Sequence, residues 1–136
     1  MKQRFFLFVL LAFVFAAPVV QADQTTSYTL GAIKNALAEG KTVFVDYAAS
    51  WCSTCAAQER AIKSLRSENP AYDKAITFFR VDWDTFKNED VTTSRNIPRR
   101  STLLVLKGDK ELGRVVAGTS KSEIKALMDK GLAMGE

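Results

Sequence analysis

Cys52 and Cys55 are the residues of this sequence best suited to chemistry. They are its two cysteines, the chain contains no histidine, and Trp51 precedes them directly. They follow the apolar run 42–49, which reads as a buried strand leading into a helix. Residues three apart on a first helical turn share one face, so the two sulfurs can form a reversible bond. Cys52 faces the positive end of the helix, which favours its thiolate form. We therefore predict that Cys52 attacks a partner and that Cys55 resolves the resulting mixed disulfide.

Three other uses of the two cysteines are open. A purely structural disulfide is one, although a bridge that closes so short a loop restrains the unfolded chain little. A metal site is another: zinc usually needs four ligands, but two thiolates suit Cu(I) or a metal shared between two chains. A redox-inert binding module is the third. Dithiol exchange is the favoured interpretation, with Cu(I) or zinc handling as its alternative.

Residues 1–22 have the pattern of a secretory signal peptide. Lys2 and Arg4 precede an apolar run over 5–17, and Pro18 and a small-residue cleavage site at Val20-Gln21-Ala22 follow it. The run is shorter than the roughly 20 apolar residues of a membrane-spanning helix. We therefore expect cleavage after Ala22, a single domain over 23–136, and a soluble periplasmic protein with no stable membrane insertion.

The composition excludes one class of partner. Of the chain, 47% is hydrophobic and 25% charged, as expected for one globular domain. The net charge of the chain is +4, from 19 basic and 15 acidic residues. Without Lys2 and Arg4 of the leader, 17 basic residues remain and the net charge is about +2. Such a small excess gives no reason to expect nucleic-acid binding.

Hydrophobic spacing predicts an α/β fold. Helices are expected over 28–39 (ended by Gly40), 53–67, about 88–95, and from Thr119 or Ser120 onward, with Glu123 forming a capping box on Ser120. Strands are expected over 43–45, 77–81, 101–106 and 112–116, the last two forming a hairpin around Gly108. Residues 23–27 are polar and are expected to be frayed. The order predicts a mixed sheet of about four strands, parallel with an antiparallel hairpin, flanked by helices.

The chain resembles thioredoxins, and more particularly the C-terminal thioredoxin-like domain of periplasmic DsbD-type disulfide reductases. The resemblance covers roughly residues 28–133. It is carried by the run 41–48 leading into Trp51-Cys52-x-x-Cys55, by 102–107, by 116–118 and by Ser120-Lys121. A C-x-x-C motif alone is a moderate signal, but Trp51 and Asp46 on its amino-terminal side make the resemblance specific.

The resemblance implies roles for two residues near the cysteines. Asp46 matches a buried acid that helps to deprotonate Cys55, directly or through water, and burial would raise the pKa of such a carboxyl. The alternative is a structural ion pair, with Arg80 on the neighbouring strand as the cation. Trp51 is interpreted as a shield and a platform beside Cys52, whereas Trp83 is expected to serve packing.

The sequence departs from the family where a cis-proline normally faces the cysteine pair. Aligning 102–107 with the family strand places Ser101 at that position, whereas aligning Ile97-Pro98 with the family's Ile-Pro inserts three residues into the loop. The first alignment is preferred, and the Arg100–Ser101 peptide is then expected to be trans. Arg99, Arg100 and Ser101 are predicted to bind the partner, the two cations also favouring the Cys52 thiolate.

The resemblance implies a protein-disulfide oxidoreductase that needs no cofactor beyond the Cys52–Cys55 disulfide. Its expected partners are protein disulfides and a membrane thiol transporter that supplies electrons. The absence of histidine and proline between the cysteines leaves the redox potential open.

Overall fold

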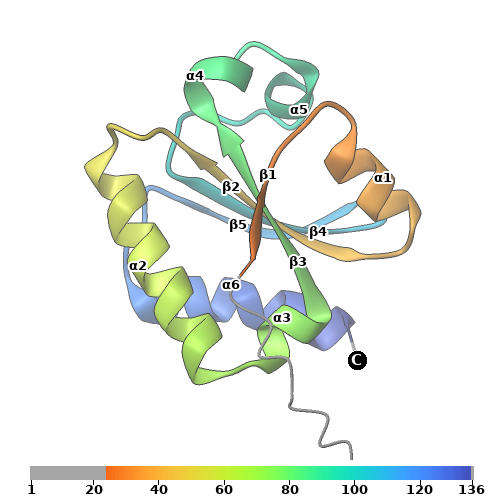
Figure 1. Cartoon of the computed structure of the whole chain (residues 1–136), viewed down its shortest axis with the longest axis vertical. Coiled ribbons are helices and arrows are strands. Elements are labelled where there is room, and N and C mark those ends of the chain that lie inside the picture. Colours follow the sequence, from red (N-terminus) through yellow and green to blue (C-terminus); the bar gives the residue numbers. More distant parts are fainter. Residues whose placement is uncertain (1–23, 136) are drawn as a thin grey trace, which may run out of the picture.

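The computed structural model describes residues 24–135, so the predicted signal peptide lies outside the described residues. Five strands form one sheet in the order β1-β3-β2-β4-β5 (Figure 1). The strands are β1 (Thr25–Ser27), β2 (Thr42–Ala48), β3 (Ile76–Asp82), β4 (Thr102–Lys107) and β5 (Lys110–Val116). The helices are α1 (Ala32–Ala38), α2 (Ser53–Glu68), α3 (Ala71–Ala75), α4 (Trp83–Phe86), α5 (Asp90–Thr93) and α6 (Lys121–Met134).

The central strand β2 is buried along its whole length and lies between two different neighbours. It pairs in parallel with β3 and antiparallel with β4, and β4 pairs antiparallel with β5. The parallel βαβ unit and the antiparallel hairpin confirm the predicted mixed sheet. Gly108, with φ +59°, makes the hairpin turn, which favours a residue without a Cβ.

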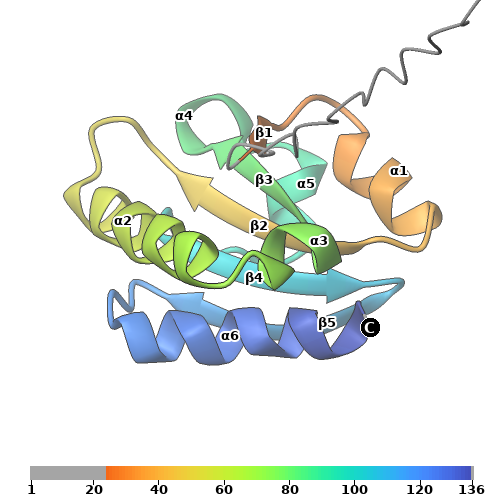
Figure 2. The same ribbon diagram turned by 60° about the horizontal axis from the view of Figure 1, so that its bottom comes forward.

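Helices cover both faces of the sheet (Figure 2), and a hydrophobic core lies on each face. One core lies under α2, α3 and α6, where Phe44, Leu103 and Met128 are fully buried. The other lies under α1 and the segment that carries α4 and α5, where Val45, Tyr47 and Leu104 are buried. Neighbouring residues of β2 and β4 thus point into opposite cores, which explains their continuous apolar runs.

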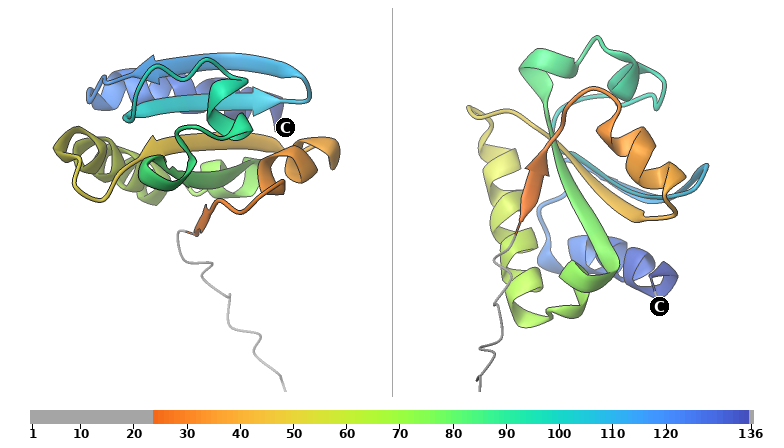
Figure 3. Two further views of the ribbon diagram at one scale, coloured as in Figure 1. Left: turned by 90° about the horizontal axis from the view of Figure 1, so that it is seen from above. Right: turned by 45° about the vertical axis from the view of Figure 1, so that its right-hand side comes forward.

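The prediction of a frayed segment before residue 28 was wrong for Thr25–Ser27. These residues form β1, which pairs in parallel with Phe78–Arg80 of β3, at the opposite edge of the sheet from the hairpin (Figure 3). Their side chains are exposed, so the strand depends on backbone pairing and leaves no apolar signature. Thr25 Oγ1 also accepts a hydrogen bond of 2.8 Å from the buried Arg66. The sheet therefore has one strand more than predicted.

Several helix ends also differ from prediction. α1 begins four residues later than expected, because Tyr28 N–H still donates to the Arg80 carbonyl and extends the β1 edge. The short helices α3 and α4 were not predicted. α6 begins after Ser120 and buries Ile124, Leu127 and Met128 as predicted, but the capping box is wrong because Ser120 makes no side-chain cap. Its hydroxyl instead hydrogen-bonds that of Ser122.

Candidate functional site

The two cysteines lie at the junction of β2 and α2 and are joined by a disulfide. Cys52 is the N-cap of α2, and its Sγ accepts a 3.1 Å hydrogen bond from the Cys55 backbone N–H. Cys52 is 4% exposed and Cys55 is completely buried, in a small cluster with Ala48 and Ala49. The helix therefore offers an N–H donor to the outer sulfur, as an attacking thiolate would require.

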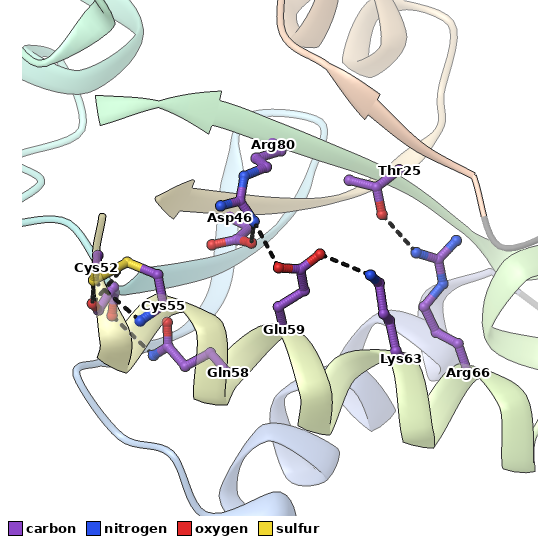
Figure 4. A network of polar contacts seen from close by, with 10 residues as sticks. Thr25, Asp46, Cys52, Cys55, Gln58, Glu59, Lys63, Arg66 and Arg80 are labelled. Atoms are coloured by element: carbon purple, nitrogen blue, oxygen red, sulfur yellow. Dashed lines mark hydrogen bonds and ion pairs between the residues drawn. A yellow bond between two sulfur atoms is a disulfide. The ribbon is translucent and has the colours of Figure 1, made fainter. Parts of the chain in front are cut away.

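Asp46 lies on β2 with its carboxyl between the disulfide and Arg80 (Figure 4). Burial raises the pKa of Asp46 from 3.8 to about 7, although Arg80 opposes this rise. The Arg80 guanidinium is 3.4 Å from Oδ2, while Oδ1 is buried without a hydrogen-bond partner among the described residues. The structure has features of both interpretations of Asp46. Arg80 lies beside the carboxyl, as in an ion pair, and a pKa of about 7 suits proton exchange near neutral pH.

A cavity of about 270 Å³ lies between α2 and the strands β1, β2 and β3, and Asp46 is one of its lining residues. Charged side chains of α2 and β3 also line it. Glu59 Oε2 is 3.5 Å from Arg80, and Glu59 Oε1 is 2.9 Å from Lys63 Nζ. Lys63 and Arg80 lower the pKa of Glu59. The cavity therefore places Asp46 next to a chain of alternating charges.

Ser101 lies on the other side of the disulfide, directly before β4. It is fully buried, and its hydroxyl oxygen is 3.2 Å from Cys52 Sγ and 3.1 Å from Cys55 Sγ. Pro98, by contrast, is exposed. No cis peptide bond occurs within residues 24–135, so Arg100–Ser101 is trans as expected. The residue that faces the dithiol is thus a serine.

The segment that carries the disulfide, Asp46 and Ser101 also matches a known protein family. The thioredoxin family model matches residues 24–130, which include the disulfide, Asp46 and Ser101. The chain belongs to the thioredoxin family. The five-stranded sheet with helices on both faces is accordingly a thioredoxin fold.

Individual relatives agree with the family match. Thioredoxin-1 of Saccharomyces cerevisiae is 31% identical over 97 residues, which cover 71% of this chain and 87% of the yeast protein. Thioredoxin-T of Drosophila melanogaster is 30% identical over 94 residues, but this chain spans just 56% of its length. Among solved structures, Trxlp from Edwardsiella tarda superposes with a TM-score of 0.68 at 28% identity, covering 77% of this chain and 98% of that one.

Family membership together with the Cys52–Cys55 pair makes the protein a protein-disulfide oxidoreductase. Thioredoxins act on protein disulfides through a redox-active disulfide and work without a separate cofactor, as the resemblance implied. Within residues 24–135, no group of three or more His, Cys, Asp or Glu side chains is placed to hold a metal ion.

Trp51, which is exposed, and Arg100, which is partly buried, form the outer border of the site. The Trp51 side chain is 59% exposed, and its Nε1–H donates a 2.8 Å hydrogen bond to Asp84 on α4. The Arg100 guanidinium stacks over the Trp51 ring, 4.5 Å from the centroid. Arg99 Nε donates to the Arg100 carbonyl. Among the described contacts neither arginine reaches a sulfur, so the influence of their charge on Cys52 stays a prediction.

Gln58 belongs to this site but was not predicted. It is fully buried on α2, and its Nε2 donates to the carbonyls of Ser101 and Gly118, at 3.0 and 2.9 Å. Gln58 comes three residues after Cys55 and therefore lies on the same helix face. A polar residue at this spacing was the signal available in the sequence. Trp83, as predicted, packs partly buried beside the cysteine cluster.

Proposed function

We propose that the protein is a periplasmic thiol:disulfide oxidoreductase that reduces or isomerises protein disulfides. The observation that carries the proposal is the Cys52–Cys55 disulfide at the start of α2, beside a buried Asp46 whose pKa is about 7. A carboxyl with this pKa can take up and release a proton at neutral pH, which a dithiol needs in each cycle.

The reaction begins with the Cys52 thiolate. It attacks one sulfur of a substrate disulfide, which breaks the substrate S–S bond, forms a mixed disulfide and releases a substrate thiolate that takes a proton from water. Cys55 then gives up its proton, with Asp46 as the acceptor. The Cys55 thiolate attacks Cys52 Sγ, the mixed disulfide breaks, and the second substrate thiolate leaves. The substrate has gained two electrons and the protein has become the Cys52–Cys55 disulfide.

The direction of electron flow rests on the resemblance to DsbD-type domains in the residues around the cysteines. It favours reduction or isomerisation over oxidation, with a membrane thiol transporter as the donor that restores the dithiol. Periplasmic export rests on the predicted signal peptide at residues 1–22 and cleavage after Ala22. Within residues 24–135 no helix is long and apolar enough to cross a bilayer.

The equilibrium reduction potential of the Cys52–Cys55 pair tests the direction. A value near thioredoxin's, about −270 mV, supports reduction, whereas one near a strong oxidant's, about −120 mV, contradicts it. Fractionation of the producing cells, with the mass of the exported protein, tests the cleavage after Ala22. Recovery of an uncleaved chain in the cytoplasm would contradict the proposed location.

The same two thiolates could instead handle a soft metal. Anaerobic titration of the reduced protein with Cu(I) and with zinc, beside an assay of disulfide reduction, separates the two functions. Tight binding of one ion per chain together with negligible disulfide reduction would favour metal handling. Active reduction with weak metal binding favours the proposed function.

A further inference from the structure

The Ser101 hydroxyl lies within hydrogen-bond distance of both sulfurs of the disulfide. Its oxygen lies at nearly equal distances from them, 3.2 Å to Cys52 Sγ and 3.1 Å to Cys55 Sγ. A serine hydroxyl carries one hydrogen to donate and can rotate to aim it. Ser101 is fully buried, so bulk water does not compete for this hydrogen.

The backbone at Ser101 is strained and is held in place by long-range hydrogen bonds. Its φ is +62°, in the left-handed region, which is unfavourable for a residue with a Cβ. Its N–H donates to the Tyr47 carbonyl at 2.8 Å, and its carbonyl accepts from Ala117 N–H at 2.8 Å and from Gln58 Nε2 at 3.0 Å. Strain fixed from three directions at a reactive site points to a function for the side chain that it positions.

A proline cannot take over this arrangement. Its ring holds φ near −65° and it has no N–H, so it could neither adopt the observed φ nor donate to Tyr47. It also has no hydroxyl. The serine at this position therefore adds a hydrogen-bond donor that the proline of other thioredoxins cannot supply.

We propose that Ser101 is a catalytic residue that donates its hydroxyl hydrogen bond first to the Cys52 thiolate and then to the Cys55 thiolate. Neutral disulfide sulfurs are weak acceptors, whereas a hydrogen bond to a charged acceptor is roughly twice as strong, so the interaction strengthens where negative charge develops. The Cys55 N–H contacts Cys52 alone, so among the described hydrogen bonds the Ser101 hydroxyl is the one that reaches both sulfurs.

The hydroxyl keeps its own proton throughout the reaction. In the reduced protein it donates to the Cys52 thiolate. Once Cys52 forms the mixed disulfide it carries no charge, and the hydroxyl rotates toward Cys55 as Asp46 accepts the Cys55 proton. The bonds made and broken are those of thiol–disulfide exchange, so no additional oxidant or reductant is required.

The test measures the thiolate form of each cysteine separately. Ultraviolet absorbance of the thiolate is followed across a pH titration, in a Cys55→Ala background for Cys52 and in a Cys52→Ala background for Cys55, and variants are compared at a pH just below the midpoint of each parent. Adding Ser101→Ala or Ser101→Gly removes the hydroxyl, and we expect the thiolate fraction to fall about tenfold in both backgrounds, as for loss of a hydrogen bond to a charged group. This readout is independent of the direction of electron flow and of export.

Glycine and a neighbouring threonine provide the controls. Glycine adopts a positive φ freely, so Ser101→Gly decides the question even if Ser101→Ala does not fold. Thr102→Val removes the adjacent buried hydroxyl, which donates to the Arg99 carbonyl and not to a sulfur, and should leave the thiolate fraction unchanged. The proposal is overturned if both Ser101 variants match the parent, if alanine alone has an effect, or if Thr102→Val has the same effect as Ser101→Gly.

Discussion

The two sides of the Cys52–Cys55 disulfide differ in kind. On one side, Asp46 carries a titratable carboxyl, borders a cavity of about 270 Å³ and has Arg80 and Glu59 nearby. On the other side, Ser101 is uncharged and fully buried, and backbone hydrogen bonds hold it in place. The first side is suited to proton exchange, whereas the second offers a rotatable hydroxyl donor on a backbone held in place.

This difference suggests a division of labour within one small site. Proton exchange needs a route to water and a pKa near neutral, which the Asp46 side has. Stabilising a thiolate by hydrogen bonding needs a donor atom that is already within reach, and the Ser101 oxygen lies within reach of both sulfurs. Each side can be altered separately by a single substitution.

The largest expected effect comes from removing the sulfur that both sides serve. With Cys55→Ala, Cys52 can still attack, but nothing within the chain resolves the mixed disulfide. Turnover in a disulfide-reduction assay should fall to background while covalent adducts with substrate accumulate on non-reducing gels. Cys52→Ala is the control and should form no such adducts with substrate. Adducts through Cys55 in that control would reverse the assigned roles of the two cysteines.

A change of Asp46→Asn should alter how stability depends on pH. The pKa of Asp46 is about 7 in the folded state, above the ordinary value of 3.8 that applies to the unfolded chain. Protonation of Asp46 therefore stabilises the folded state. This stabilisation is complete below about pH 4 and lost as the pH rises to about 7, a change of about 4 kcal/mol at about 1.4 kcal/mol per unit. Denaturant titrations across this range should therefore show the variant becoming more stable than the wild type as the pH rises.

The exposed carboxyl of Asp109, in the hairpin turn, provides the control for this experiment. Asp109→Asn should leave the pH dependence of unfolding as it is in the wild type. If the wild type and Asp46→Asn keep a constant difference in stability from acid to neutral pH, the pKa of Asp46 is the same in the folded and unfolded states. The proton-exchange role of the Asp46 side would then fail.

Gln58→Met should loosen the Ser101 side without touching a sulfur. It removes the donor to the Ser101 and Gly118 carbonyls, and the loss of such a buried partner costs about 1–3 kcal/mol. We expect this loss in the free energy of unfolding, together with a smaller Cys52 thiolate fraction. Thr92→Val is the control, because it removes a side-chain donor to another backbone carbonyl, that of Phe86. It should lower the free energy of unfolding and leave the Cys52 thiolate fraction unchanged. An unchanged thiolate fraction in Gln58→Met would deny that Gln58 positions Ser101.

The smallest effect is expected at the outer border formed by Trp51 and Arg100. The stacking of Arg100 on Trp51 should contribute about 0.5–1 kcal/mol, measurable as the coupling energy between Arg100→Ala and Trp51→Ala. The Arg99→Ala, Arg100→Ala double variant should lower the Cys52 thiolate fraction less than Ser101→Gly does, because neither guanidinium contacts a sulfur. It should also slow reaction with acidic substrates, most strongly at low salt. A larger loss of thiolate than in Ser101→Gly would place the control of Cys52 at this border.

Local sequence patterns predicted the Asp46 side better than the Ser101 side. The strand, the helix and the C-x-x-C motif are encoded by neighbouring residues, and so is the burial of Asp46 within an apolar run. The position of the Ser101 hydroxyl depends on a positive φ, which is maintained by Tyr47, Gln58 and Ala117 from three distant parts of the chain. β1 escaped prediction for a similar reason, because it is held by backbone pairing with β3 and by the contact of Thr25 with Arg66.

The positive φ at Ser101 also limits how this chain can exchange sequence with its relatives. A mutation from serine to proline would have to reverse the sign of φ and leave the Tyr47 carbonyl without its donor, so it requires compensating changes elsewhere. A loop grafted from a proline-bearing thioredoxin faces the same barrier, because it too leaves the Tyr47 carbonyl without its donor. In evolution and in engineering, replacing Ser101 by proline therefore requires a new backbone path at residue 101 and another donor for the Tyr47 carbonyl.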